Sequence, residues 1–274
     1  MQSENTIKVM TFNLRRDSRH DNENRWKYRR ELAASFIKRS DAAIIGVQEL
    51  LPSMREDIGN LLTGYSIFGE GRNKNFTNEH SDIIINNEKA NVRDVQTFWL
   101  SKKPNIPGSR AYFAVFPRIC TVADVYLKDS RRRIRVFNTH FDHICGPARH
   151  LGADLILRHM AEDMKTDPTP MILMGDLNAR PTSKTVKIIL ERSKKYGIPL
   201  VDAYLEGGAY HDGYVNTHHG FHGKLVNKRK NKNHIDYIFV SSDFEVMETQ
   251  VNCFNDAGRY PSDHYPLTAV LKLK

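Results

Sequence analysis

The sequence predicts an α/β protein in which two β-sheets pack against each other and helices lie outside them. The first observation is that strand-like segments follow one another along the chain, with only a few helical patterns between them. The second is that no linker, internal repeat or low-complexity stretch divides the 274 residues, so residues 1–274 are expected to form one domain. A hydrophobic content of 40% and a charged content of 27% are ordinary for a chain with a sizeable core.

The first half of the chain combines strands with two helical patterns. Apolar residues recur at helical spacing between Trp26 and Arg39, which predicts an amphipathic helix. A shorter helix is expected from Met54 to Leu62. Alternating or continuous apolar runs predict strands at residues 7–12, 43–47, 65–68, 82–85 and 92–100.

The second half continues the same pattern. Pro147 suits the first turn of a helix, where its missing amide hydrogen costs nothing. Helices are therefore expected at residues 147–164 and 183–194, followed by a loop-rich stretch up to Asn233. Strands are expected at residues 119–127, 133–139, 171–174, 235–240, 245–251 and 267–271.

The most informative stretch runs from Pro170 to Pro181. Its apolar run, Met171 to Met174, is bounded by Pro and Gly, which is typical of a buried central strand. Asp176 and Asn178 follow directly, so the strand is expected to present two polar groups at its carboxyl end. An ordinary Asp/Asn turn after a strand explains this stretch equally well when it is taken alone.

The bulk composition limits the environment and the partner. A net charge of +9 and a pI near 9.4 favour an anionic partner, with phosphorylated metabolites, nucleic acid and acidic lipid surfaces all open. No apolar run approaches the length of a membrane span, and the first ten residues lack a signal-peptide pattern. Three widely spaced cysteines argue against a disulfide framework, so a cytoplasmic location is expected.

Polar residues recur where the predicted strands end. They are Asn13, Glu49, Asn138 with His140, Asp176 with Asn178, Asp236, and Asp263 with His264. Each alone is most simply a turn or surface residue, but the recurrence favours a shared site. Carboxylate and amide oxygens suit Mg²⁺ or Mn²⁺, and nearby histidines can hold or protonate a phosphate oxygen. The sequence contains neither a Cys-x-x-Cys or His-Glu-x-x-His zinc pattern nor a Gly-x-Ser-x-Gly elbow.

Six segments together resemble the endonuclease/exonuclease/phosphatase superfamily, which has the deoxyribonuclease I-like fold. They are MTFNLR (10–15), GVQEL (46–50), NTHFDH (138–143), GDLNARP (175–181), HIDYIFVS (234–241) and SDHYPL (262–267). They occur in the family's order and cover almost the full chain. The resemblance implies a four-layer α/β sandwich with two mixed β-sheets face to face, helices on the outside and the site at one edge. It also implies divalent-metal-dependent phosphoester hydrolysis.

The resemblance implies roles for residues where the motifs match. Glu49 resembles the family's main metal ligand, and Asn13 and Asp263 resemble residues close to the Mg²⁺ or Mn²⁺ ion. Asp176 resembles the residue that orients or deprotonates the attacking water. These roles agree with general chemistry, because phosphoester hydrolysis needs an in-line water and neutralised charge. A bound Mg²⁺ polarises the phosphoryl oxygen.

Further residues are implied to act on the phosphate. Asn178 and His140 resemble ligands of phosphate oxygens, and His264, paired with Asp236, resembles the histidine that stabilises the developing charge. A carboxylate beside His264 would raise the pKa of its imidazole and keep it cationic. Glu79 resembles the residue that orients His140 in the deoxyribonuclease branch.

Within the superfamily, the chain resembles a bacterial branch that includes sugar-phosphate phosphatases, among them enzymes acting on maltose 6′-phosphate. This resemblance rests on residues 24–29, 97–101, 107–112, 117–119 and 217–221. It implies an anionic, phosphorylated small molecule as substrate, with Arg118 and His219 as candidates for the substrate side of the site. For Arg118, a surface salt bridge is an equally good interpretation.

Two other functions remain open from the sequence. A nuclease acting on DNA or RNA would use the basic residues at 131–135 and from Lys224 to Lys232 to contact the phosphate backbone. Solvated loop lysines and arginines explain both clusters as well, and aromatic residues are not interleaved with them. The second cluster would also attract any anionic substrate if it flanked the site. A non-catalytic binding protein on the same scaffold is disfavoured, because the proposed metal and water-positioning residues are all present.

Overall fold

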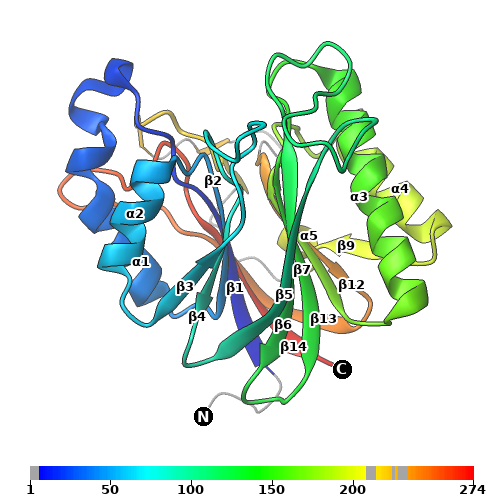
Figure 1. The fold of residues 1–274 in the computed structure, drawn as a ribbon. Coiled ribbons are helices and arrows are strands. Elements are labelled where there is room, and N and C mark those ends of the chain that lie inside the picture. Colours follow the sequence, from blue (N-terminus) through cyan, green and yellow to red (C-terminus); the bar gives the residue numbers. More distant parts are fainter. Residues whose placement is uncertain (1–5, 208–213, 224–225, 228–233) are drawn as a thin grey trace.

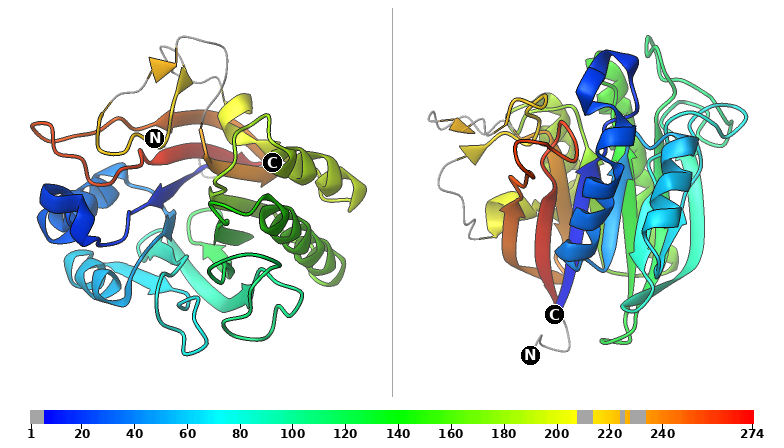
Figure 2. Two further views of the ribbon diagram at one scale, coloured as in Figure 1. Left: turned by 90° about the horizontal axis from the view of Figure 1, so that it is seen from above. Right: turned by 90° about the vertical axis from the view of Figure 1, so that its left-hand side faces the viewer.

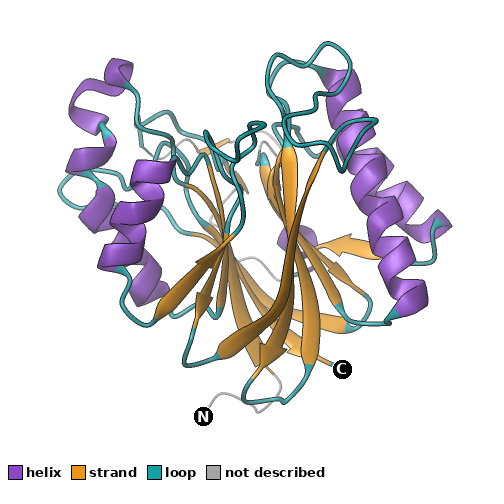
Figure 3. Ribbon diagram, in the orientation of Figure 1, coloured by secondary structure: helices purple, strands orange, loops and turns teal. Residues whose placement is uncertain are grey.

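Residues 6–207, 214–223, 226–227 and 234–274 are described by the computed structural model of the chain. Two six-stranded sheets face each other, and helices cover the outer face of each sheet, as Figures 1 and 3 show. The arrangement therefore has four layers, helix–sheet–sheet–helix. This confirms the α/β sandwich that the sequence predicted.

The first sheet has the strand order β13-β14-β1-β2-β4-β3. Its strands are β1 (Thr6–Asn13), β2 (Ile44–Gln48), β3 (Tyr65–Phe68), β4 (Ile83–Asn86), β13 (Phe244–Val251) and β14 (Leu267–Leu273). β1 runs parallel to β2 and antiparallel to β14. Two helices, α1 (Arg30–Ser40) and α2 (Pro52–Leu61), pack on its outer face.

The second sheet has the order β5-β6-β7-β8-β12-β9. Its strands are β5 (Ala90–Trp99), β6 (Ile119–Leu127), β7 (Arg133–His140), β8 (Met171–Asp176), β9 (Leu200–Asp202) and β12 (Asp236–Ser241). The outer helices are α3 (Gly146–Thr166) and α4 (Lys184–Lys195). The remaining described elements are α5 (Ala203–Glu206), a two-stranded ribbon of β10 (Tyr214–Val215) and β11 (Val226–Asn227), and the 3-10 turns η1 (Arg19–Asn24) and η2 (Trp26–Tyr28).

The central strands are apolar on both faces because each sheet is covered on both sides. In β8, Ile172 packs between the two sheets, whereas the next residue, Leu173, packs under the helices α3 and α4. In β1, Val9 likewise packs between the two sheets, and the next residue, Met10, packs under the helices α1 and α2. Successive side chains of a strand point to opposite faces, so a continuous apolar run supplies both the inner and an outer core.

Two predicted boundaries were wrong. The helix expected from Trp26 begins at Arg30, because Trp26 forms a separate 3-10 turn and its indole N–H donates to Asp57, 2.8 Å away. The stretch expected to be loop up to Asn233 contains β9, α5, β10 and β11. These elements are only two to four residues long, and β9 exists through its pairing with β12 rather than through its own pattern.

The helix ends follow local sequence signals. The Ser183 hydroxyl accepts a hydrogen bond from the amide of Val186 and so caps the first turn of α4. Pro147 lies in the first turn of α3, as its missing amide hydrogen allows. None of the helices in the described ranges has the length and apolar character that a membrane crossing requires. The three cysteines are free.

The strand registers bring the polar strand ends to one edge. His140 of β7 lies opposite Asp176 of β8, and Asp236, the first residue of β12, lies opposite Asp176 on the other side. In the facing sheet, Asn13 ends β1 beside Gln48 at the end of β2. Strand ends from both sheets thus meet under the loops at the top of Figure 1, the same edge that Figure 2 shows from above.

A buried asparagine joins the two sheets just below this edge. The Asn138 amide of β7 donates to the carbonyls of Val47 (2.9 Å) and Asp82 (2.8 Å) in the other sheet and accepts from the Gln48 amide (2.7 Å). Gly46 makes room for it, since a Cβ there would lie 2.6 Å from the Asn138 Oδ1. Asn138, one of the polar strand-end residues in the sequence, therefore connects the sheets.

Replacing Asn138 by alanine is expected to destabilise the protein by about 2–4 kcal/mol, because two carbonyls and the Gln48 amide would lose their partner in a dry interface. Urea unfolding should show a lower midpoint at an unchanged slope. The control Asn91→Ala, at an exposed position of β5, should stay within about 0.5 kcal/mol of the wild type. Equal midpoints for both variants would contradict the role assigned to Asn138.

Candidate active site

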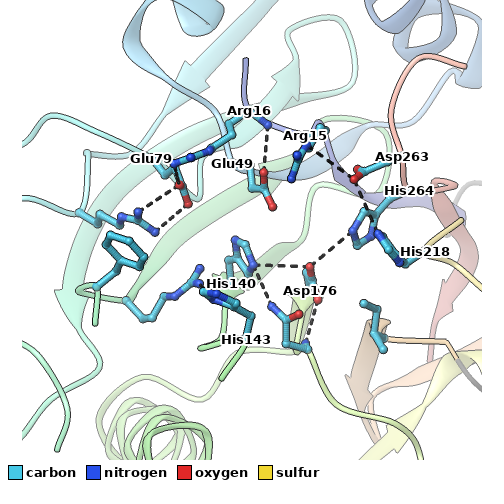
Figure 4. Close-up of a pocket in the computed structure, with 15 residues that line it drawn as sticks. Arg15, Arg16, Glu49, Glu79, His140, His143, Asp176, His218, Asp263 and His264 are labelled. Atoms are coloured by element: carbon cyan, nitrogen blue, oxygen red, sulfur yellow. Dashed lines mark hydrogen bonds and ion pairs between the residues drawn. The ribbon is translucent and has the colours of Figure 1, made fainter. Parts of the chain in front are cut away.

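A cavity of about 390 Å³ opens among the loops at the shared strand edge. Fifteen residues line it, and Figure 4 shows their side chains. Eight of them were singled out in the sequence: Glu49, Glu79, Arg118, His140, Asp176, Asn178, Asp263 and His264. Asn13 and Asp236 lie directly behind the wall and contact Asp176 and His264.

Asp176 occupies the centre of this arrangement. Its Oδ2 accepts a hydrogen bond from the Asn13 side-chain amide (3.0 Å), and its Oδ1 accepts one from the backbone N–H of Asn178 (2.8 Å). The Nε2 atoms of His140 and His264 lie 3.5 and 3.9 Å from Oδ2. Burial, and then repulsion from Asp236, raise the pKa of Asp176 to about 7. Such a carboxyl group takes up and releases a proton near neutral pH.

The glycine before Asp176 is needed for the approach of β7. Gly175 has a φ of 141°, and a Cβ there would lie 1.9 Å from the carbonyl oxygen of Thr139. Only glycine fits at this point. The Gly-Asp pair of the GDLN motif therefore has a local cause: the glycine lets two parallel strands meet where the aspartate enters the cavity.

His264 and Asp236 form a buried pair beside Asp176. The Nδ1–H of His264 donates to the Oδ2 of Asp236 over 2.9 Å, and both side chains are almost completely buried. Burial alone would lower the pKa of His264, but the charges of Asp236, Asp176 and Asp263 outweigh it and raise the pKa to about 10. The imidazole is therefore cationic at neutral pH, and its Nε2–H faces Asp176 and the cavity.

His140 is neutral, in contrast to His264. Burial, followed by repulsion from Arg118 and Arg72, lowers its pKa well below the usual value. The Asn178 amide nitrogen donates to the carbonyl of Phe141 (3.1 Å), which fixes the amide orientation, and it also lies 3.0 Å from the Nε2 of His140. His140 therefore accepts through Nε2. These two side chains hold each other at the edge of the cavity.

Glu49 and Asp263 supply the oxygen atoms that a metal ion would use. The Glu49 carboxylate accepts from the backbone N–H of Arg16 (3.0 Å) and from the Asn13 amide (3.3 Å). Burial alone would raise the pKa of Asp263, but His218, His264 and Arg15 hold it well below the usual range. Both side chains line the cavity, and this set of hard oxygen donors fits Mg²⁺ or Mn²⁺.

Asn13 positions the carboxylates. Its Oδ1 accepts the backbone N–H of Arg15 (2.9 Å), so its amide nitrogen is the end that bridges Glu49 and Asp176. The Glu49 carboxylate beside one sheet and the Asp176 carboxylate of the other are thus held by a single amide. Side-chain atoms of His218, Asp263 and His264 also lie within 4.8 Å of one another, but a cationic His264 has no lone pair to give to a metal ion.

Several cavity residues have a left-handed backbone. Arg15, Glu49 and Asn178 have φ values of 50°, 60° and 46°, a region that costs a non-glycine residue roughly 1–2 kcal/mol. Such residues concentrate at functional sites, where the surrounding contacts compensate for them. In each case the side chain has polar partners in the site wall.

Sequence reasoning did not single out the other seven residues that line the cavity. They are Arg15, Arg16, Arg72, Phe116, His143, His218 and Ile235. Two of them, Arg15 and Arg16, follow Asn13 after one intervening residue, and that proximity could have identified them. The other five lie on loops with no periodic pattern, and Arg72 and Phe116 have no motif residue to mark them.

Two expectations about individual residues were wrong. His219 does not line the cavity: it is only 2% exposed and stacks on Tyr265 at 4.0 Å. Its backbone N–H donates to the Asp263 carbonyl, and this turn brings the neighbouring His218 into the cavity wall instead. Glu79 does not orient His140; its carboxylate is bound by Arg72 (2.7 and 3.0 Å) and Arg16 (3.3 Å).

The family model for the endonuclease/exonuclease/phosphatase family matches residues 10–264. The chain belongs to this family. It is therefore a phosphoesterase, and the resemblance found in the sequence is confirmed. None of the curated proteins compared with the chain matches it.

Solved structures of family members are similar over the whole phosphoesterase chain. A family protein from Bacteroides thetaiotaomicron has 28% identity and a TM-score of 0.89, with 98% of this chain and 95% of that chain covered. A mannosyl-6-phosphatase from the same species has 29% identity and a TM-score of 0.87, covering 97% and 99%. A family protein from Bacteroides vulgatus has 29% identity and a TM-score of 0.88, covering 98% and 99%.

Arg118 of the phosphoesterase is not a surface salt bridge. The residue is only 7% exposed and lines the cavity, and its Nη2 lies 3.1 Å from the Nδ1 of His143. No carboxylate lies within ion-pair distance of Arg118 in the described part of the chain. A buried guanidinium without an anionic partner is a natural binding group for an anion.

The basic clusters lie away from the described cavity or outside the described residues. Arg133 and Arg135 lie in the first part of β7, whereas His140 ends it, so about 23 Å and about 17 Å of strand separate them from His140. Both are paired with acidic residues, Asp124, Asp163 and Asp167. Most of the cluster from Lys224 to Lys232 falls outside the described residues.

The activity is expected to peak between about pH 7 and pH 10. It should rise with pH as Asp176 loses its proton and fall again as His264 loses its own. Asp236→Asn removes the anion that raises both pKa values, so both limbs should move to lower pH. A profile of kcat/KM against pH measures this, and an alkaline limb that stays in place in the variant would contradict the assignment.

Proposed function

We propose that the protein is a divalent-metal-dependent phosphatase of a small phosphorylated metabolite, such as a sugar or disaccharide phosphate. The observation that carries the proposal is the cavity. Its volume of about 390 Å³ lies at the low end of the roughly 300–1,000 Å³ typical of small-molecule sites. The cationic His264, the buried Arg118 and the carboxylates converge in it, so one phosphate group would meet all of them.

The name of one relative supports this substrate class. The mannosyl-6-phosphatase is similar in both sequence and structure over almost the whole of each chain. The nuclease alternative has less support, because Arg133 and Arg135 are paired with acids at the far end of β7.

In the proposed mechanism, Glu49 and Asp263 hold Mg²⁺ or Mn²⁺, with Asn13 keeping Glu49 in place. When bound, the ion would supply charge neutralisation at the phosphoryl group. Asp176 accepts the proton of the attacking water at its carboxylate, which its pKa of about 7 permits near neutral pH. Water is oriented by the same carboxylate, whose direction Asn13 and the Asn178 amide fix.

The histidines and Arg118 act on the phosphate itself. His264 donates its Nε2–H to a phosphoryl oxygen and stabilises the charge that builds up in the transition state, while Asp236 keeps it cationic. Arg118 attracts the phosphate electrostatically. Asn178 would donate to a phosphate oxygen by exchanging its hydrogen bond to His140. The released imidazole would join it as a donor in the neutral tautomer that carries its proton on Nε2.

Asp176→Asn and His264→Ala are each expected to lower kcat by about 10²-fold or more, the scale for a lost base or charge stabiliser. The matched control Asp94→Asn changes an exposed carboxylate in β5 and should keep wild-type turnover. Steady-state phosphate release measures all three. Near-normal hydrolysis by both site variants would exclude the mechanism.

A substrate screen tests the reaction. In the presence of Mg²⁺, we expect phosphate release from sugar phosphates and intact supercoiled plasmid, single-stranded DNA and RNA. EDTA should abolish the release because it removes the metal ion, and Glu49→Ala should abolish it because the variant lacks the main ligand of the ion. Nicked plasmid or degraded RNA at comparable enzyme levels, lost in Glu49→Ala, would instead support a nuclease.

A further inference from the structure

We propose that Arg72, Glu79 and Phe116, here called the saccharide wall, bind the sugar part of the substrate beside the phosphate site. All three line the cavity on the side opposite Asp176 and His264, as the left part of Figure 4 shows for Glu79. The inference rests on the proposed phosphatase function and deepens it. These residues would contact the alcohol that leaves when the phosphate ester is hydrolysed.

The charged groups of the wall are fixed in place and already paired. The Arg72 guanidinium donates a hydrogen bond to each carboxylate oxygen of Glu79. The two side chains are only 4% and 9% exposed. The Nε of Arg72 has no hydrogen-bond partner although it is buried. A carboxylate and a guanidinium held side by side offer acceptors and donors together, which matches the hydroxyl groups of a sugar, each of them both donor and acceptor.

Phe116 adds an apolar surface to this polar pair. The Arg72 guanidinium lies over its ring at 4.7 Å from the centroid, which orients the ring beside the pair. The residue is 40% exposed, so part of its surface remains open to a ligand. The face of a sugar ring that carries C–H groups packs on an aromatic face, while the hydroxyls at its edge remain free for Glu79 and Arg72.

Arg16 places the wall next to the reacting phosphate. Its backbone N–H donates to Glu49, the proposed metal ligand, and its side chain contacts Glu79 at 3.3 Å. The two halves of the cavity are therefore one side chain apart. A phosphate bound at Glu49 and Asp176 would bring the sugar that carries it directly onto the wall.

The test compares Phe116→Ala with Phe113→Ala, a control on the same loop that is 89% exposed and does not line the cavity. The readout is the ratio of kcat/KM for a disaccharide 6′-phosphate to that for propyl phosphate, which has no ring and no hydroxyls. Phe116→Ala should lower this ratio about tenfold, mainly through KM, as loss of one aromatic contact does. Phe113→Ala should leave the ratio as in the wild type.

A second measurement addresses Glu79 from the substrate side. The KM of the wild type is measured for deoxy analogues, each of which lacks one sugar hydroxyl, and at least one analogue should raise it severalfold. The same analogue should raise the KM of Glu79→Gln much less, because this variant has already lost the partner of that hydroxyl. If the wild type has the same KM for every deoxy analogue as for the parent sugar phosphate, Glu79 does not bind a sugar hydroxyl.

The outcomes separate this inference from the proposed function. If the wild-type protein releases no phosphate from any sugar phosphate, the phosphatase proposal itself fails before a variant is compared. If it does release phosphate but the ratio is the same in Phe116→Ala, Phe113→Ala and the wild type, the reaction stands and the saccharide wall is refuted.

Discussion

The site depends on keeping the edges of two separate sheets together. Glu49 follows a strand of one sheet and Asp176 ends a strand of the other, so neither sheet alone contains the proposed reaction centre. Apolar packing between the sheets has no direction and would tolerate sliding. Side-chain amides supply the direction: Asn138 bonds backbone carbonyls across the interface, and Asn13 bridges the two carboxylates.

Burial then sets the chemistry of that edge. The strand alternation that places Val136 between the sheets also aims Asn138 and His140 inward, so the polar residues continue the inner face of the apolar core. In this dry setting the charges must compensate one another. Asp236 makes His264 cationic and raises the pKa of Asp176, whereas Arg118 and Arg72 help to keep His140 neutral. Opposite protonation states in neighbouring histidines follow from neighbouring charges.

The sequence predicted the parts of the fold and site that depend on local pattern. Apolar periodicity located the long strands, and the residues singled out in the sequence include eight of the fifteen that line the cavity. It failed where a long-range contact decides the structure. β9 exists through pairing with β12, and the helix expected at Trp26 is delayed by a contact with Asp57. The choice of His218 over His219 depends on a turn bonded to the Asp263 carbonyl, which no pattern reveals.

The same distinction explains how the cavity divides. On one wall, the registers of β7, β8 and β12 fix Asp176, and the bond to Asp236 fixes His264, so this wall cannot change without disturbing the sheet. The wall that carries Arg72 and Phe116 comes from loops, and a loop accepts new residues while the strands below it stay in place. A fold built in this way can retain one phosphoryl chemistry while its loops select the leaving group. The substrate is therefore expected to depend on the loop residues near 72–79 and 116, which none of the six family motifs includes.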